Sequence, residues 1–575
     1  PSRDPTAPSR DPAAGDTDTD TNTGGTHMQF DADNIAIRRP AMIESGFWLD
    51  QTINKSLDDA AIAHPERTAL TAVRLGGSTV SLTYRELAET ADRVAVGLHR
   101  LGVRSNDIVA VQLPNWWEFT IAYLACARIG AVMNPLMHIF RERELEFMLG
   151  HGEASVAIIP STFRGHDFRA MYDELRERLP HLEHVIAVDD DGPEGFAARL
   201  TGTAWEEQAD AAEILSSSRP GPDDITQLIY TSGTTGEPKG VMHSSNTLYS
   251  NIVPYAERLH LDTDDIVLMA SPMAHQTGFM YGLIMPVMLG CPAVLLDVWD
   301  PGQAVELINE HAVTFTMAST PFLADLADRA DLADLAESGN QPVPSLRTFL
   351  CAGAPIPGPL VERAQRTLGA NIVSAWGMSE NGAVTTTLID DDPSRAIDTD
   401  GCPLPGAQVK VVDIDDAELP VGETGRLLVK SCSNFGGYLK RAQLNATDAD
   451  GWFDTGDLAR LDEHGYIRIT GRSKDVIIRG GENIPVVEIE SLLYAHRAVA
   501  QVAIVALADE RLGERACAVV VTKPGESFTF DEMITHLEQS RLAKNYLPEK
   551  LIILDAMPTT PSGKIQKFKL RDKIS

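Results

Sequence analysis

The feature that most constrains this chain is a run of eleven residues from Tyr230 to Gly240, Tyr-Thr-Ser-Gly-Thr-Thr-Gly-Glu-Pro-Lys-Gly. Residues 225–230 ahead of it are apolar and β-branched, which predicts a buried β-strand. Glycines let the backbone approach an anion, hydroxyls add hydrogen-bond donors, and Lys239 adds a positive charge. The run is not the ordinary P-loop, because its lysine follows Pro238 and not a glycine. The run predicts a phosphate-binding loop, with a polar surface turn as the alternative. The residues expected to bind phosphate are Thr231, Ser232, Gly233, Thr234, Thr235, Gly236 and Lys239.

Two further loops follow predicted strands, at residues 347–350 and 372–375. The first loop is Gly353-Ala354-Pro355, and the second is Trp376-Gly377-Met378-Ser379-Glu380. Ligands of open α/β sheets bind beyond the carboxyl ends of the strands. We therefore expect these loops to meet the phosphate loop at one cleft. The plainer alternatives are a common Gly-Ala-Pro turn and a Ser-Glu helix cap.

The surrounding pattern predicts a large α/β domain with a parallel sheet. Thr83 and Glu86 form a capping box at the start of one helix, and Asn115 with Glu118 is expected to cap the next. From about Gly401 the chain changes to short strands and turns, which predicts a β-rich subdomain. We expect a disordered tail over 1–27, an N-terminal domain over 28–471 and a small α+β domain over 472–575.

Composition excludes several classes of partner. Lysine and arginine total 49 against 82 acidic residues, a net charge of −33, which disfavours nucleic acids and anionic membranes. So acidic a surface also repels ATP, so the cleft must carry local basic groups. The six cysteines have no C-x-x-C spacing, which suits reduced thiols in the cytoplasm. Residues 266–296 lack charge, but prolines interrupt them, so we expect core elements and no membrane span.

These motifs resemble the adenylate-forming enzymes: acyl-CoA and aryl-CoA ligases, the adenylation domains of peptide synthetases, and the luciferases. The resemblance runs from about Gln29 to Ser575. It implies that a carboxylic acid reacts with ATP to give an acyl-adenylate and pyrophosphate, and that CoA then takes the acyl group. The implied C-terminal domain is mobile. The N-terminal residues 45–48 and the region around His275 look most like ligases of medium-chain or alicyclic acids, such as cyclohexanecarboxylate.

The resemblance also implies roles for residues near the nucleotide. Glu380 would hold Mg²⁺ between the ATP phosphates, since this ion prefers carboxylate and phosphate oxygens. Asp457 and Arg472 would bind the ribose, whereas nearby Asp454 suits a turn-stabilising role. The family usually has a tyrosine and a threonine where this chain has Trp376 and Ser379. The remaining ATP-binding residues are then Gly353, Ala354, Pro355, Gly377 and Met378.

Other implied roles concern the acyl group and CoA. His275 would line the acyl pocket, although a lone histidine in an apolar stretch is more often a core residue. Lys564 would stabilise the adenylation transition state, and Lys474 would be the hinge of the small domain. The CoA channel is expected to be lined by Gly480, Gly481 and Glu482.

Two other functions remain open. A stand-alone adenylation enzyme that loads a separate carrier protein would share every ATP motif. A non-catalytic nucleotide-binding protein would be expected to lack Lys564 or Glu380, and both are present. The expected partners are thus a carboxylic acid, ATP and CoA, with a homodimer as the assembly to test.

Overall fold

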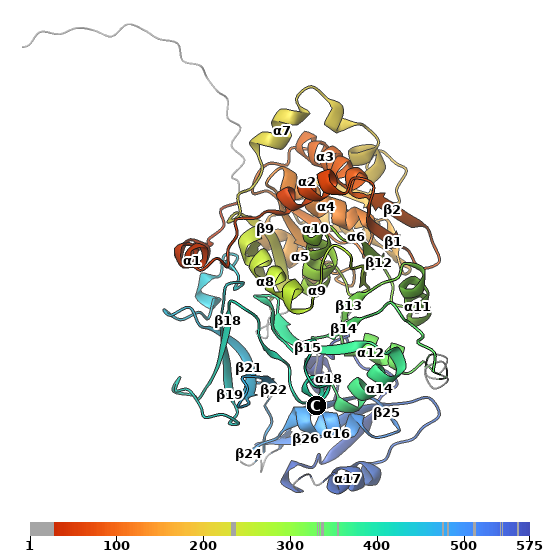
Figure 1. Cartoon of the computed structure of the whole chain (residues 1–575), viewed down its shortest axis with the longest axis vertical. Coiled ribbons are helices and arrows are strands. Elements are labelled where there is room, and N and C mark those ends of the chain that lie inside the picture. Colours follow the sequence, from red (N-terminus) through yellow and green to blue (C-terminus); the bar gives the residue numbers. More distant parts are fainter. Residues whose placement is uncertain are drawn as a thin grey trace, which may run out of the picture.

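Two large sheets dominate the N-terminal part of the molecule (Figure 1). The computed structural model describes residues 28–574 except 232–236, 330–331, 333, 335–338, 354–355, 474–475, 480–481, 510–512, 541, 543 and 561–562, and only the backbone of 478, 482, 483, 513 and 545. From edge to edge, the described strands of the first sheet are β17 (Cys402–Pro403), β16 (Gly382–Thr386), β15 (Asn371–Met378), β14 (Thr348–Cys351), β13 (Phe315–Ala318), β11 (Val267–Met269), β12 (Ala293–Leu296), β1 (Thr68–Val73) and β2 (Thr79–Thr83). Those of the second are β20 (Gly437–Tyr438), β10 (Lys239–Ser244), β9 (Ile225–Thr231), β4 (Val132–Pro135), β3 (Ile108–Val111), β5 (Val156–Pro160) and β8 (His184–Val188).

Most interior strands of both sheets pair in parallel, as predicted, whereas β10 and β16 pair antiparallel with both of their neighbours. In the first sheet β13 pairs in parallel with β14, and β14 with β15. In the second, β3 pairs in parallel with β4 and β5. These strands are apolar and buried on both faces because helices cover parallel sheets. The described α-helices of this part are α1 (Asp33–Glu44), α2 (Ile53–Ala63), α3 (Tyr84–Arg100), α4 (Trp117–Arg128), α5 (Glu142–Gly152), α6 (Phe168–Arg176), α7 (Ala211–Ser217), α8 (Ser245–Arg258), α9 (Gln276–Gly278), α10 (Met285–Leu289), α11 (Pro301–Glu310), α12 (Thr320–Ala327), α14 (Gly358–Leu368) and α15 (Ser394–Asp398). The π-helices η1 (Ala197–Thr201) and η3 (Phe279–Ile284) and the 3₁₀ helix η2 (Trp205–Glu207) also belong to it.

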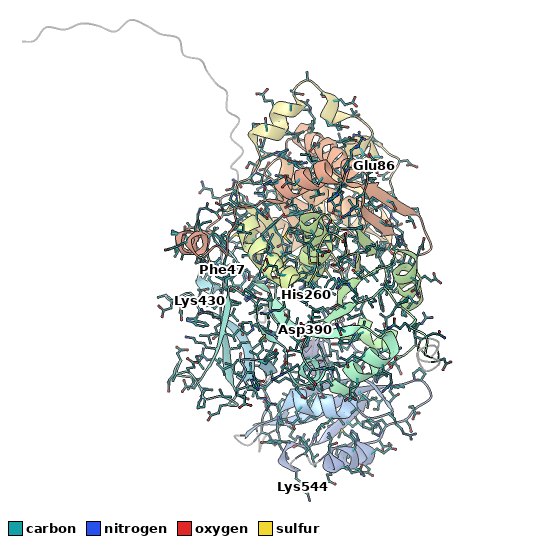
Figure 2. The ribbon with its side chains drawn as sticks, viewed as in Figure 1. Phe47, Glu86, His260, Asp390, Lys430 and Lys544 are labelled. Atoms are coloured by element: carbon teal, nitrogen blue, oxygen red, sulfur yellow. The ribbon has the colours of Figure 1, made fainter. Side chains whose placement is uncertain are left out.

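One predicted helix cap is confirmed and the other is wrong. The Thr83 hydroxyl accepts from the Glu86 backbone N–H, and the Glu86 carboxylate, labelled in Figure 2, accepts from the Thr83 N–H. Asn115 does not cap α4, which begins at Trp117 without a side-chain cap bond. Its amide nitrogen instead donates to the Ser271 carbonyl at 2.9 Å, and its amide oxygen accepts from the Met273 N–H at 2.7 Å. Asn115 thus ties the loop after β3 to the loop after β11, across the two sheets.

The C-terminal third contains the predicted β-rich unit and α+β unit. The first is a sheet of β18 (Ala407–Val412), β19 (Gly425–Ser431), β21 (Phe453–Leu461) and β22 (Ile467–Arg472). The second is a sheet of β24 (Glu482–Asn483), β23 (Ile478–Arg479), β26 (Gly513–Thr522), β25 (Val499–Asp509) and β27 (Lys550–Ile553), with helices α16 (Val486–Tyr494), α17 (Phe530–Gln539) and α18 (Lys567–Ile574). The predicted α/β fold is confirmed, whereas the boundary at Gly471/Arg472, within the end of β22, stays a prediction.

Residues 266–296 form β11, α9, η3, α10 and β12, as expected for core elements. Among the helices that the structure describes, none combines the length and apolar character that crossing a bilayer requires.

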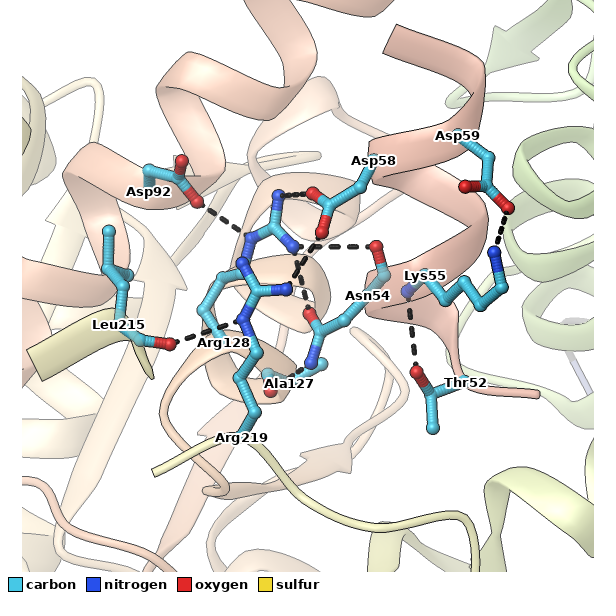
Figure 3. Close-up of polar contacts among 10 residues, drawn as sticks. All are labelled: Thr52, Asn54, Lys55, Asp58, Asp59, Asp92, Ala127, Arg128, Leu215 and Arg219. Carbon is cyan, nitrogen blue, oxygen red and sulfur yellow. Dashed lines mark hydrogen bonds and ion pairs between the residues drawn. The ribbon is translucent and has the colours of Figure 1, made fainter. Parts of the chain in front are cut away.

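A buried arginine joins three helices of the N-terminal part (Figure 3). Arg128, at the end of α4, is 1% exposed and pairs with Asp58 of α2 at 2.6 Å and Asp92 of α3 at 2.7 Å. Arg219, which precedes β9, contacts the other oxygen of Asp58 at 2.8 Å. The two aspartates are 34% and 29% exposed, so water partly solvates them.

We expect Arg128→Met to lower the free energy of unfolding by about 2 kcal/mol. Removing one partner of a fully buried pair costs about 3–5 kcal/mol, and the partial exposure of both aspartates reduces that cost. The matched control is Lys55→Met, which removes an exposed pair with Asp59 on the neighbouring face of α2 and should cost less than about 1 kcal/mol. Urea titration compares them, and equal shifts would contradict a structural role for Arg128.

Candidate active site

The two described ends of the predicted phosphate loop lie on paired strands. Thr231, the last residue of β9, is the antiparallel partner of Lys239, the first residue of β10. The Lys239 ammonium donates to the Tyr438 hydroxyl at 2.8 Å and lies 4.1 Å from the centre of that ring. Residues 232–236 lie outside the described part of the chain. The structure therefore fixes the base of this loop and the position of its lysine.

Glu380 lies in the turn between β15 and β16. Its side chain is buried, and one carboxylate oxygen accepts from the Tyr438 hydroxyl at 2.7 Å. The preceding Ser379 carbonyl accepts from His243 Nε2 at 2.7 Å. Burial lowers the pKa of His243 to about 4, so this ring is neutral at physiological pH. Lys239, Tyr438 and Glu380 thus form one continuous chain of hydrogen bonds.

Asp457 is held by both of its carboxylate oxygens. One accepts from the indole N–H of Trp376 at 2.9 Å, and the other from Arg472 Nε at 3.1 Å. Asp457 on β21 and Arg472 on β22 are also strand partners. Asp454 accepts instead from the Gly456 N–H at 2.9 Å, the turn-stabilising contact expected for it. The proposed ribose residues and Trp376 are therefore brought together, with lone pairs of the carboxylate left to accept two hydroxyls.

Two positions of the predicted nucleotide loops, Gly353 and Gly377, require glycine for different structural reasons. Gly353 follows β14 with φ +88°, and among the described residues, its chain neighbours aside, no atom lies within 4 Å of where a Cβ would stand. Its backbone is therefore open to a ligand. A Cβ on Gly377 would lie 2.0 Å from the Gly382 carbonyl oxygen, so close packing of β15 on β16 explains that glycine. Met378 packs against the core of the β-rich unit, and Ala354 and Pro355 lie outside the described residues.

The charge of Lys564 reaches His275, although the two residues belong to different parts of the chain. Burial, and secondly the charge of Lys564, lower the pKa of His275 to about 4. His275 Nδ1 accepts from the Thr277 N–H at 3.4 Å, so a neutral ring carries its proton on Nε2. A Cβ on Gly563 would lie 2.7 Å from Pro321 Cγ, so the lysine loop rests on the start of α12. The small domain therefore presents Lys564 to the cleft side of the large domain.

The remaining predicted residues are described incompletely. Lys474, Gly480 and Gly481 lie outside the described residues, and of Glu482 only the backbone is described, paired with Arg479 in the β23–β24 hairpin. Next to His275, Phe279 and Met280 of η3 are buried. The Met280 methyl would stand 3.0 Å from a Cβ on Gly382, two residues beyond Glu380. The apolar side of the site is thus built from η3 and the start of β16.

Basic groups gather around this site in an otherwise acidic protein. Lys239 is joined to Glu380 through the Tyr438 hydroxyl, and Arg472 pairs with Asp457. The charge of Lys564 reaches His275. Such groups were expected, because a surface of net charge −33 repels phosphates. Each basic side chain comes from a different sheet or loop.

Tyr438 is the site residue that the sequence reasoning missed. Gly436 precedes β20, and Gly437 and Tyr438 form it. This sequence pattern does not by itself indicate a catalytic or binding role. The contacts of Tyr438 with Lys239 and Glu380 join residues 199 and 58 positions apart. A second missed feature is the buried amide contact between Gln227 and Gln276, at 2.9 Å beside His275.

No cluster of three or more metal-ligating side chains occurs among the residues that the structure describes. That is compatible with Mg²⁺, which usually takes one or two carboxylates and completes its shell with phosphate oxygens and water. Glu380 supplies an oxygen ligand of the preferred type at the centre of the site. The residues present therefore fit an ion that arrives together with a phosphate-bearing ligand.

Comparison with known proteins gives a match over most of the chain. The AMP-binding enzyme model matches residues 57–439, and the model of the AMP-binding enzyme C-terminal domain matches residues 488–564. The medium-chain fatty-acid–CoA ligase of Escherichia coli K12 is 35% identical over 540 residues, which cover 93% of each chain.

Two further relatives cover a similar span. The salicyl-AMP ligase / salicyl-S-ArCP synthetase of Mycobacterium tuberculosis H37Rv is 32% identical over 94% of each chain. The crystal structure of ATP-bound MatB from Rhodopseudomonas palustris superposes with a TM-score of 0.77 and 26% identity, covering 91% of this chain and 99% of that one.

Proposed function

This chain belongs to the AMP-binding enzyme family of adenylate-forming acid–CoA ligases, and from that premise we propose that it converts a medium-chain or alicyclic carboxylic acid into its CoA thioester. The observation that carries the proposal is the contact of the Gly563–Lys564 loop with the start of α12, which brings the charge of Lys564 within range of His275. Activation is needed because a carboxylate is a poor electrophile at neutral pH.

In the first step a carboxylate oxygen attacks the α-phosphorus of ATP. The bond from that phosphorus to the pyrophosphate oxygen breaks, which gives the acyl-adenylate and pyrophosphate. Asp457 and Arg472 hold the ribose, and the phosphate loop with Lys239 holds the phosphates. Negative charge builds on the α-phosphate, and the Lys564 ammonium stabilises it. Glu380 would hold Mg²⁺, which when bound neutralises charge on the phosphate oxygens.

In the second step the CoA sulfur attacks the acyl carbon and the bond to AMP breaks, while the thiol proton passes to solvent. Gly480, Gly481 and Glu482 are the residues proposed to line the entry of CoA. Lys564 and this segment both belong to the small domain, so we propose that the domain rotates about Lys474 between the steps.

Two observations support the proposed medium-chain or alicyclic acyl group. The residues that border His275 on the apolar side, Phe279 and Met280, are large and uncharged. The relative from Escherichia coli is named for medium-chain fatty acids. A carrier protein is the second candidate for the acceptor, because the relative from Mycobacterium tuberculosis is named both as an AMP ligase and as a carrier-protein synthetase. A cytoplasmic location and a homodimer are proposed from the sequence alone.

The decisive experiment measures acid-dependent exchange of labelled pyrophosphate into ATP over a panel of straight-chain, alicyclic and aromatic acids. We expect exchange to be fastest with acids of about six to ten carbons that lack polar ring substituents. CoA is then compared with a pantetheinylated carrier protein as acceptor of the best acid. Exchange with aromatic hydroxy acids alone, or transfer to the carrier alone, would contradict the proposal.

A further inference from the structure

We propose that Tyr438 is a positioning residue for the metal-binding carboxylate: its hydroxyl holds Glu380 in place and keeps the Lys239 ammonium from pairing with it. The inference rests on the proposed function, because it takes Glu380 as the residue that meets the metal–ATP complex. It assigns a role to a residue outside the loops that the sequence singled out.

The two hydrogen bonds of the Tyr438 hydroxyl run in one direction, because it accepts from Lys239 and donates to Glu380. A phenol hydroxyl carries one proton and can accept hydrogen bonds as well. The proton goes to Glu380 at 2.7 Å, since a carboxylate can only accept, and the hydroxyl oxygen accepts from Lys239 at 2.8 Å. Ammonium and carboxylate are thus separated by one hydroxyl group in a buried setting.

The surrounding segment holds Tyr438 rigidly. β20 pairs with β10 through Val241 opposite Tyr438, and the tyrosine ring packs edge-on against Phe435 with centroids 4.7 Å apart. The Phe435 N–H donates to the Glu380 carbonyl at 2.8 Å, and the Leu439 N–H donates to the Gly240 carbonyl at 2.8 Å. One short segment is therefore fastened both to the Glu380 turn and to the strand that carries Lys239.

Without the hydroxyl, the group that separates the ammonium of Lys239 from the carboxylate of Glu380 is lost. Opposite charges attract more strongly in a buried site than in water, and a lysine side chain is long and flexible enough to close the gap of one hydroxyl. A carboxylate that is paired with an ammonium is a poorer ligand for a divalent cation. Partners that orient a metal ligand typically change metal affinity by about 10- to 100-fold when they are removed.

The test measures Mn²⁺ affinity by electron paramagnetic resonance in the presence of saturating α,β-methylene-ATP, which cannot be cleaved at the α-phosphorus. We expect Tyr438→Phe to weaken Mn²⁺ binding by about tenfold. The matched control is Tyr466→Phe, which removes a tyrosine hydroxyl that also donates to a carboxylate, Asp391, at 2.8 Å. This control should leave Mn²⁺ affinity unchanged.

A double variant separates positioning from damage to the fold. Because Lys239 also holds the ATP phosphates, the double variant of Tyr438→Phe with Lys239→Met is compared with Lys239→Met alone. In that background no ammonium remains to occupy Glu380, so Tyr438→Phe should cost less than half as much Mn²⁺ affinity, on a logarithmic scale, as it costs in the wild type. Unchanged affinity in Tyr438→Phe, or an equal cost in both backgrounds, would overturn the inference. Glu380→Gln is the reference: if it too binds Mn²⁺ normally, the metal assignment in the proposed function fails instead.

Discussion

Lys564→Ala should lower the rate of acyl-adenylate formation by about 10²- to 10³-fold, the loss typical when one preorganised group that stabilises developing charge is removed. The cause is electrostatic: the attacked α-phosphate gains negative charge, and Lys564 is the basic group whose charge reaches His275. Pyrophosphate release in a single turnover measures this step. Conversion of supplied acyl-adenylate to thioester should change by less than about threefold, because in the proposed mechanism the small domain has rotated and Lys564 no longer lies at the phosphate.

The matched control is Lys569→Ala. Lys569 belongs to the same small domain and the same basic stretch, but in the described contacts its ammonium lies over the Phe568 ring at 5.8 Å. Removing this charge should leave both half-reactions unchanged. If Lys569→Ala slows adenylation as much as Lys564→Ala, the effect comes from the general charge of the tail, and the specific role of Lys564 is wrong.

The parts of the site that could be predicted from the sequence depend on residues that are close together along the chain. Strand, loop and helix periods placed the phosphate loop after a buried strand, and β9 confirms that position. The predicted Glu380 loop began too early: β15 extends through Met378, so Trp376, Gly377 and Met378 belong to the strand, and only Ser379 and Glu380 lie in the turn. The capping box at Thr83 and the turn contact of Asp454 are also confirmed, because each joins residues at most three positions apart. Such contacts depend on backbone geometry that neighbouring residues determine.

The parts that the sequence did not predict depend on long-range packing. Asn115 has the spacing of a helix cap, yet its amide meets carbonyls about 150 residues away, because the two sheets bring their carboxyl ends together there. Tyr438 becomes a site residue only where β20 joins the edge of β10. A buried amide or hydroxyl must find hydrogen-bond partners wherever the fold supplies them, and one sequence does not show which distant groups those are.

The second large effect concerns Gly563, which precedes Lys564. We expect Gly563→Ala to slow adenylation by about a hundredfold. Its φ is +79°, a region that costs other residues about 1–2 kcal/mol. The added Cβ would also lie 2.7 Å from Pro321 Cγ and 3.0 Å from Ser319 Oγ, and such overpacking costs about 1–3 kcal/mol. Only the clash depends on how the two domains are arranged, and at the upper end of its range, about 3 kcal/mol, it corresponds to roughly a hundredfold in rate.

Gly525→Ala separates these two costs. Gly525 has φ +80° in the same domain, and no atom of the described chain, apart from its sequence neighbours, lies within 4 Å of its Cβ position. This variant bears the backbone cost alone, away from the large domain, so both half-reactions should keep their rates. Gly563→Ala should also keep its thioester step within about threefold, because a small domain that has rotated away no longer presses on Ser319 and Pro321. Equal losses in both half-reactions would mean that the two domains keep one arrangement throughout, and the proposed rotation about Lys474 would then be wrong.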